Sequence, residues 1–177
     1  MPILATYRNG VYDFFLLLHI LCAIIGFGAV YLNALYGQEV RKRPGPEGLA
    51  VFEANFRISK IAEYFIYAVF VFGLVLLALA TSPVGDAHVF KFSQTWVWLA
   101  IVVYVVGLGV SHGVLMPSLK KMRTLMGEMI AAGPPVGGPP PQASEMEQLG
   151  KKVGAAGATL NVLLVVILAL MIWKPGY

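Results

Sequence analysis

The chain has 177 residues, of which 58% are hydrophobic and only 12% charged, with a mean hydropathy of +0.76. This composition excludes an ordinary soluble domain, and a single cysteine excludes an internal disulfide or a thiolate metal cluster. The net charge of +4 comes from basic residues in loops between apolar runs, so we expect no nucleic-acid partner. We predict an all-α, polytopic membrane protein that forms a single transmembrane domain over residues 1–177 and contacts the lipid bilayer.

Four apolar runs are each long enough to cross the roughly 30 Å hydrocarbon core of a bilayer. We predict membrane-spanning helices at about 11–36, 61–80, 94–119 and 153–173. Gly48–Lys60 mixes apolar and charged residues at helical spacing, which predicts an amphipathic lead-in helix to the second span, lying at the membrane interface. Lys120–Lys152 is the longest predicted loop, and its Pro/Gly-rich part at 133–144 predicts a flexible segment without a fold of its own.

Basic residues are distributed unevenly between the two sides of the predicted bundle. Ten of the 13 Lys and Arg residues lie in the loops after the first and third runs, and only Arg8, Lys91 and Lys174 lie on the other side. Because basic loops stay in the cytoplasm, we predict a four-helix bundle with both termini outside, N-out/C-out. All three tryptophans then fall at the outer face, as is typical of aromatic residues at a membrane interface.

Two histidines lie inside predicted spans, where lipid offers a polar side chain no hydrogen-bond partner. His19 is in the first run, and His112 is in the third, within a Gly109–Gly113 GxxxG spacing that favours close helix contact. Pro117 follows and is expected to kink or end this span. Each histidine either binds a haem, a metal ion or a proton, or bonds to a neighbouring helix and holds the bundle together.

The depths of the two histidines argue against a single haem held by both. At about 1.5 Å per residue, His19 lies about 10 Å below the outer interface, counted from Tyr12, and His112 lies about 24 Å below it, counted from Trp96. Bis-histidine ligation needs both rings at nearly the same depth, and this difference is roughly 13 Å. We therefore expect one histidine per site, each with a different second ligand.

Other polar groups in the spans have fewer interpretations. Glu63 opens the second span at the level of His112, so we expect the two to meet as a buried polar pair or a proton path, unless Glu63 reaches the interface instead. Asn33 and Asn161 are expected to form hydrogen bonds between helices. The sequence contains no Walker loop, GxSxG, HExxH or dinucleotide fingerprint, so it gives no enzyme assignment.

Three stretches carry a resemblance to known proteins, namely LLLHILCAIIGFGAVYLNALYG with the basic loop after it, WVWLAIVVYVVGLGVSHG, and the closing MIWKPG. In these stretches the chain resembles a group of small, uncharacterised bacterial four-helix inner-membrane proteins loosely grouped with the copper-resistance protein D family. More distantly, the chain resembles the HemJ-type protoporphyrinogen oxidase, which binds haem b and carries a His in its first span and a Tyr-His pair late in another.

His19 matches the first of these HemJ-type positions, and His112 matches the second with Ser111 in place of the tyrosine. The lysine that this family carries after the tryptophan of the later span is absent, since Ala100 and Ile101 stand in that region. The resemblance implies a multi-pass protein of the bacterial inner (plasma) membrane with a haem or metal role, and it does not imply oxidase activity.

These features favour two functions. The first is a haem- or metal-associated membrane protein acting in electron transfer or cofactor handling, with His19 and His112 as cofactor-binding residues, Glu63 as a polar partner, and haem b or copper as the cofactor. The alternative is a non-catalytic accessory or assembly subunit of a larger membrane complex, bound to a membrane-protein partner or to copies of itself through its small-residue helix faces.

Overall fold

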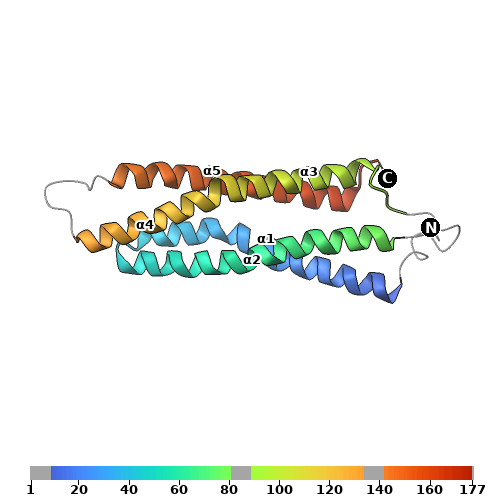
Figure 1. The fold of residues 1–177 in the computed structure, drawn as a ribbon, viewed down its shortest axis with the longest axis horizontal. Helices are drawn as coiled ribbons and strands as arrows, with labels where there is room; N and C mark the ends of the chain where they lie inside the picture. The colour runs from blue at the N-terminus through green and yellow to red at the C-terminus, as the bar shows by residue number, and fades with distance from the viewer. Residues whose placement is uncertain (1–8, 81–88, 134–141, 177) are drawn as a thin grey trace.

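Helices make up almost all of the chain that this computed structural model describes, namely residues 9–80, 89–133 and 142–176 (Figure 1). The elements are α1 (Gly10–Lys42), α2 (Pro46–Leu79), α3 (Thr95–Val110), the π-helical turn η2 (Ser111–Leu115), α4 (Met116–Ala132) and α5 (Gln142–Trp173). Since η2 and α4 continue α3, the described residues form four helical rods that are each long and apolar enough to cross a membrane. The predicted all-α fold with four membrane-spanning helices is confirmed.

The four rods alternate in direction along the chain. The start of α1 and the end of α5 therefore lie at the same end of the bundle, as Figure 1 shows. The turn between α1 and α2 lies at the opposite end, together with the end of α4 and the start of α5. This arrangement agrees with two termini on one side of the membrane, and the assignment of that side to the outside stays a prediction from the distribution of charge.

α1 and α2 form a tightly packed hairpin. Its turn uses glycine at Gly45, whose φ of 72° lies in the left-handed region, and at Gly48, where a Cβ would lie 2.0 Å from the Arg43 carbonyl oxygen. Midway along the hairpin, a Cβ at Gly26 would lie 2.9 Å from Cγ1 of Ile66. Small residues at such points let helices approach closely in lipid, where van der Waals packing contributes to helix association.

The third rod and α5 form a second hairpin, and the two hairpins meet only in part. α1 approaches α5, and α2 approaches α4, but no Cα atom of α2 lies within 8 Å of one in α3. Figure 1 shows the two pairs as separate layers, with α3 beside α5 and α1 beside α2. Side chains therefore bridge the space between α2 and α3, and the candidate sites lie in that space.

The outward-facing side chains of the rods are mostly apolar. Leu17, Val165 and Ile172 are 62%, 64% and 72% exposed, and many other large apolar residues are similarly exposed. Such a surface suits a lipid bilayer and would favour aggregation in water. The main buried cluster lies at the end of the bundle where α1 starts and α5 ends, and it consists of Tyr12, Leu76, Leu77, Ala80, Phe90, Trp96 and Val97.

The predicted spans fall inside the four rods to within one residue, but the rods are longer, and one predicted connection is wrong. Gly48–Lys60, predicted as a lead-in helix, is helical and is the first part of α2, because no proline or internal glycine interrupts the chain between it and the apolar run. The predicted loop Lys120–Lys152 is mostly helical, because α4 and α5 extend into it from both sides. Of the flexible segment predicted at 133–144, the last three residues belong to α5, and 134–141 lie outside the described residues.

Single cysteines at Glu47 and Ser93, both exposed and at opposite ends of the bundle, test the orientation in a Cys22→Ala background. Treating intact cells with a membrane-impermeant maleimide should label the cysteine at position 93 and leave the one at position 47 unlabelled until the membrane is permeabilised, because we predict that the basic turn after α1 is cytoplasmic. Labelling of position 47 alone in intact cells would reverse the topology.

Candidate functional site

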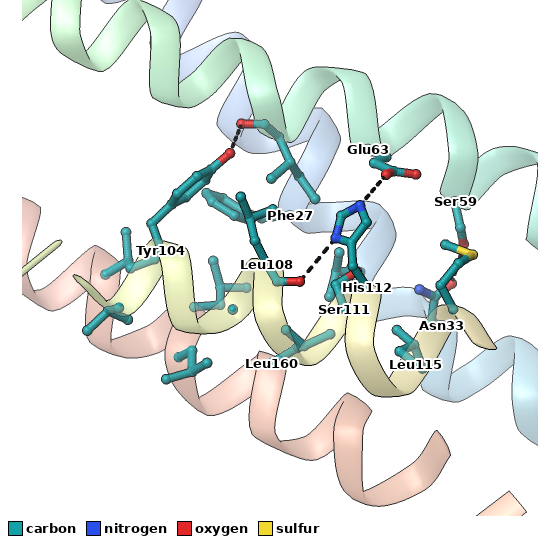
Figure 2. A pocket seen from close by; sticks show the side chains of 18 of the residues that line it. Phe27, Asn33, Ser59, Glu63, Tyr104, Leu108, Ser111, His112, Leu115 and Leu160 are labelled. Carbon is teal, nitrogen blue, oxygen red and sulfur yellow. Dashed lines mark hydrogen bonds and ion pairs between the residues drawn. The ribbon is translucent and has the colours of Figure 1, made fainter. Parts of the chain in front are cut away.

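The largest polar contact between the two hairpins joins α2 to η2 (Figure 2). Nε2 of His112 lies 2.8 Å from Oε1 of Glu63 and 2.8 Å from the Tyr67 hydroxyl oxygen. That hydroxyl also lies 2.6 Å from Oε1 of Glu63, and Lys60 Nζ lies 3.0 Å from the other Glu63 oxygen. The second ring nitrogen of His112, Nδ1, lies 3.0 Å from the Leu108 carbonyl oxygen. The expected contact between Glu63 and His112 is therefore present, and Tyr67 completes it.

Hydrogen bonds join Glu63, Tyr67 and His112 into one cluster. The Leu108 carbonyl oxygen can only accept, so Nδ1 of His112 carries a hydrogen. Nε2 then lies 2.8 Å from both the Glu63 oxygen and the Tyr67 hydroxyl, and that hydroxyl can donate its hydrogen to either of them. Such hydrogen bonds limit the cost of placing Glu63 and His112 within a membrane.

The π turn that carries His112 has a local cause. The Met116 N–H donates to the Ser111 carbonyl, five residues back, in place of the usual bond over four residues. In a regular helix the Pro117 ring would clash with the carbonyl of Gly113, and the π turn relieves that clash. Pro117 therefore does not end the span, and Figure 1 shows α4 running at an angle to α3. Such one-residue insertions are frequent at functional sites.

A cavity of about 100 Å³, the inner cavity, lies beside the cluster and is lined by all four rods. Its wall is mostly apolar, and its polar residues are Asn33, Ser59, Glu63, Tyr104, Ser111 and His112 (Figure 2). The Ser59 hydroxyl donates to Oδ1 of Asn33 at 3.1 Å, which is the interhelical bond predicted for Asn33.

The bond predicted for Asn161 is not found. Its side-chain oxygen is buried and has no hydrogen-bond partner in the described part of the chain. α5 meets α3 through Leu160 and Leu163, whose methyl groups lie 3.9 and 3.8 Å from the Cβ position of Gly107. That contact is apolar, so it gives the amide of Asn161 nothing to bond to.

His19 lies nearer the end of the bundle where α1 starts, and it also bonds to α2. Its Nδ1 lies 2.9 Å from the Val69 carbonyl oxygen, so Nδ1 donates, and in the neutral ring Nε2 keeps its lone pair. Gly73 leaves room for the ring, since a Cβ there would lie 3.2 Å from Cε1 and 3.6 Å from Nδ1 of His19. Histidines that ligate a metal commonly have one ring nitrogen bonded to a carbonyl in this way.

His19 lines a larger cavity of about 410 Å³, the outer cavity, between the two hairpins. Small-molecule sites typically measure roughly 300–1,000 Å³ and have mostly apolar walls with a few polar groups. The wall here comes from both hairpins and is mostly aliphatic and aromatic. The atoms in it that can donate, accept or ligate belong to Tyr12, His19, Trp96, Tyr104, Met171 and Lys174.

The two histidines therefore line different cavities, in agreement with the depth argument from the sequence. His19 bonds to α2 at Val69. His112 bonds to α2 at Glu63 and Tyr67, and the nearer of these, Tyr67, precedes Val69 by more than half a helical turn. Tyr104 lines both cavities.

Tyr104 also ties α3 to α2 between the two histidines. Its hydroxyl donates to the Ile66 carbonyl at 3.3 Å, and its ring stacks on Phe70 with 4.8 Å between ring centroids. Nowhere in the described residues do three or more His, Cys, Asp or Glu side chains gather as a metal site. Cys22 is buried and lines neither cavity.

One family of known sequences matches this chain. Its description reads "Predicted integral membrane protein (DUF2269)", and its profile matches residues 14–175. The chain belongs to the DUF2269 family. The match includes nearly all of the four rods of this DUF2269 protein, which is thus a multi-pass integral membrane protein with lipid around its apolar surface. No curated protein and no solved structure matches the chain. The match gives no support for a relationship to the copper-resistance D family or to the HemJ-type oxidase.

Several site residues of this DUF2269 protein were missed in the sequence. Tyr67 and Tyr104 were absent from the predictions because a tyrosine inside an apolar run has an ordinary place in a helix core. Gly73 carried no signal because its role depends on an imidazole from another helix. For Tyr67, the signal was its position four residues after Glu63, which puts both on one face of a helix.

Removing either partner of the Glu63–His112 contact should destabilise the bundle. Glu63→Ala and His112→Ala should each lower the free energy of unfolding by about 1–3 kcal/mol, because each leaves a polar group unpaired. The double variant should be less destabilised than the sum of the two, with a coupling of at least about 0.5 kcal/mol. The measurement is unfolding by sodium dodecyl sulfate in mixed micelles.

Glu47, a carboxylate at the start of α2, provides the matched control for this cycle. Glu47→Ala combined with His112→Ala should give additive effects, because Glu47 lies on the exposed turn far from η2. Additive effects of Glu63→Ala and His112→Ala as well would show that the two side chains do not interact in the folded protein.

Proposed function

We propose that this DUF2269 protein binds haem b in the outer cavity, with His19 as an axial ligand, and serves electron transfer or cofactor handling in the bacterial inner membrane. The observation that carries this proposal is the bond from Nδ1 of His19 to the Val69 carbonyl. It leaves the lone pair of Nε2 available in the wall of an apolar cavity, which is the form in which an imidazole ligates iron.

Haem fits the lining of the outer cavity better than a copper ion does. A copper ion takes most of its ligands from the protein, and the described residues contain no cluster of three His, Cys, Asp or Glu side chains. Haem brings its own ring of nitrogens and needs one or two axial ligands from the chain. His19 offers one, and the thioether of Met171, in the wall of the same cavity, is another side chain able to ligate iron.

His112 suits a different role in this proposal. Both of its ring nitrogens already have hydrogen-bond partners, Nδ1 at Leu108 and Nε2 at Glu63 and Tyr67. We therefore propose that His112 and Glu63 hold a proton between Nε2 and Oε1, at the cavity next to that of His19.

The chain's own residues then have distinct tasks. His19 would bind the haem iron, and the Val69 carbonyl fixes the tautomer of the His19 ring. The aromatic wall excludes water from the cavity. Tyr104 separates the outer cavity from the inner one and holds α3 against α2. When bound, haem b supplies one-electron redox chemistry.

A second candidate is an accessory or assembly subunit of a larger membrane complex. It is favoured by Gly109 and Gly113, whose Cβ positions have no atom of the described residues within 4 Å beyond their own helix. His112, between them, has 47% of its side chain exposed. A polar residue at a membrane-facing surface gains from a covering helix, and small residues allow one to approach.

The spectrum of the purified protein tests the haem proposal. Protein isolated in mild detergent from cells supplied with a haem precursor should show a Soret band and a reduced-minus-oxidised α-band. His19→Ala should lose most of this absorbance, because the axial ligand is gone. His112→Ala should keep it, because His112 bonds to Glu63 and Tyr67 and not to the cofactor.

Two results would contradict the proposal. One is a wild-type protein with neither haem bands nor the ability to acquire them from added haem. The other is equal loss of absorbance in His19→Ala and His112→Ala at equal helical content. A stable second protein that co-purifies with a haem-free wild type would favour the accessory role.

A further inference from the structure

We propose that the outer cavity takes an acidic amphiphile, a molecule with an apolar body and a carboxylate, and that Lys174 pairs with the carboxylate at the cavity rim. This deepens the proposed function, because it names the charge of the ligand and a second group that contacts it. It rests on the proposed function only in taking the outer cavity as a binding site.

Lys174 is positioned over the cavity and not extended into solvent. It follows the last residue of α5 and lines the outer cavity, with Nζ 4.6 Å from the ring centroid of Phe90 and 5.7 Å from that of Trp96. Both distances lie in the range of cation–π contacts. A lysine that serves only as an interfacial anchor extends its ammonium group toward water.

Within the described residues, Lys174 forms no ion pair with a carboxylate, whereas Lys60, Lys121 and Lys151 each have a glutamate partner. Burial of Lys174 lowers the pKa of its ammonium group, because two aromatic faces replace water and bring no negative charge. An anion at the rim would supply that charge in a partly desolvated place, where such a pair is stronger than one on an open surface.

The backbone holds Lys174 in this position. Its φ of 43° is left-handed, a conformation that helix ends normally give to glycine, and its N–H caps α5 by donating to the Leu170 carbonyl at 3.0 Å. Two residues later, Gly176 approaches the start of α3 so closely that a Cβ would lie 2.8 Å from Oγ1 of Thr95. A non-glycine residue in an uncommon conformation, fixed by its surroundings, is a frequent mark of a functional position.

The chemistry of the wall defines the ligand. The cavity body is apolar, His19 lies in its depth, and Lys174 is the one cationic side chain in the lining. A neutral apolar molecule would leave Lys174 without a counter-charge, and a small anion would leave the apolar body unfilled. A carboxylate on an apolar ring or chain satisfies both, and it occurs in porphyrin side chains and in fatty acids.

The test compares acids with their methyl esters, using the full-length protein in detergent micelles. The probes are metal-free protoporphyrin IX with its dimethyl ester, and dibromostearic acid with its methyl ester. Saturable quenching of tryptophan fluorescence reports binding, since Trp96 lines the cavity. In at least one pair, the wild type should bind the acid about tenfold more tightly than the ester, as expected for a charge-assisted contact.

Three variants assign that preference to Lys174. Lys174→Gln should bind acid and ester equally, Lys174→Arg should keep the preference for the acid, and Lys91→Gln should also keep it because Lys91 is exposed and outside the lining. A preference in the porphyrin pair alone or in the fatty-acid pair alone supports the proposal and tells which kind of body the cavity accepts.

Equal affinity for acid and ester in the wild type would overturn the proposal, whether or not Lys174→Gln folds. A preference that persists in a folded Lys174→Gln protein would overturn it as well. Because neither probe contains a metal, the outcome does not depend on iron ligation by His19. A cavity that binds haem through His19 and ignores charge would contradict this inference alone.

Discussion

Polar groups inside a bilayer have no water to bond, so each one needs a partner within the protein. In the spanning part of the described chain, every side-chain hydrogen bond between helices ends on α2 between Ser59 and Val69. α1 reaches this stretch through Asn33 and His19, and the third rod reaches it through Tyr104 and His112. Two of these bonds end on backbone carbonyls, those of Ile66 and Val69, which no change of side chain on α2 removes.

This dependence on α2 explains why the two hairpins are not closely packed against each other between α2 and α3. The backbones of α2 and α3 stay apart, and the side chains of Glu63, Phe70 and Tyr104 cross the space between them. A bundle packed by backbone contact would have no room there. Bridging by a few long side chains instead leaves two cavities, each with one histidine in its wall.

Hydropathy and charge in the sequence were enough to predict four spanning helices. The thickness of the membrane sets the length of each apolar run, and its low dielectric excludes most charged residues from that run. Helix ends were less predictable. A helix continues as long as its backbone is uninterrupted and one face is covered, so α2 begins well before its apolar run, and Leu125 is buried on α4 beyond the predicted span. The Pro/Gly-rich centre of the predicted loop Lys120–Lys152 led to the incorrect prediction that the residues on either side of it are also irregular.

The candidate site was only partly predictable for a different reason. An isolated charged or imidazole side chain in an apolar run stands out, so His19, Glu63 and His112 were found. Their depths along the helices also separated the two histidines correctly. Tyr104 could not be found, because its acceptor is a backbone carbonyl, which every residue has. Gly73 and Lys174 depend on the path of another helix, and one sequence without its fold does not contain that information.

The central claim is that the Val69 carbonyl fixes the ring of His19, in the wall of the outer cavity, with its hydrogen on Nδ1. The most direct measurement is NMR of ¹⁵N-labelled histidine in the purified, haem-free protein, at a mildly alkaline pH where the ring is neutral, with His19→Asn to assign the signals. The account predicts a hydrogen on Nδ1 of His19 and a bare Nε2. A hydrogen on Nε2 with a bare Nδ1 would contradict it.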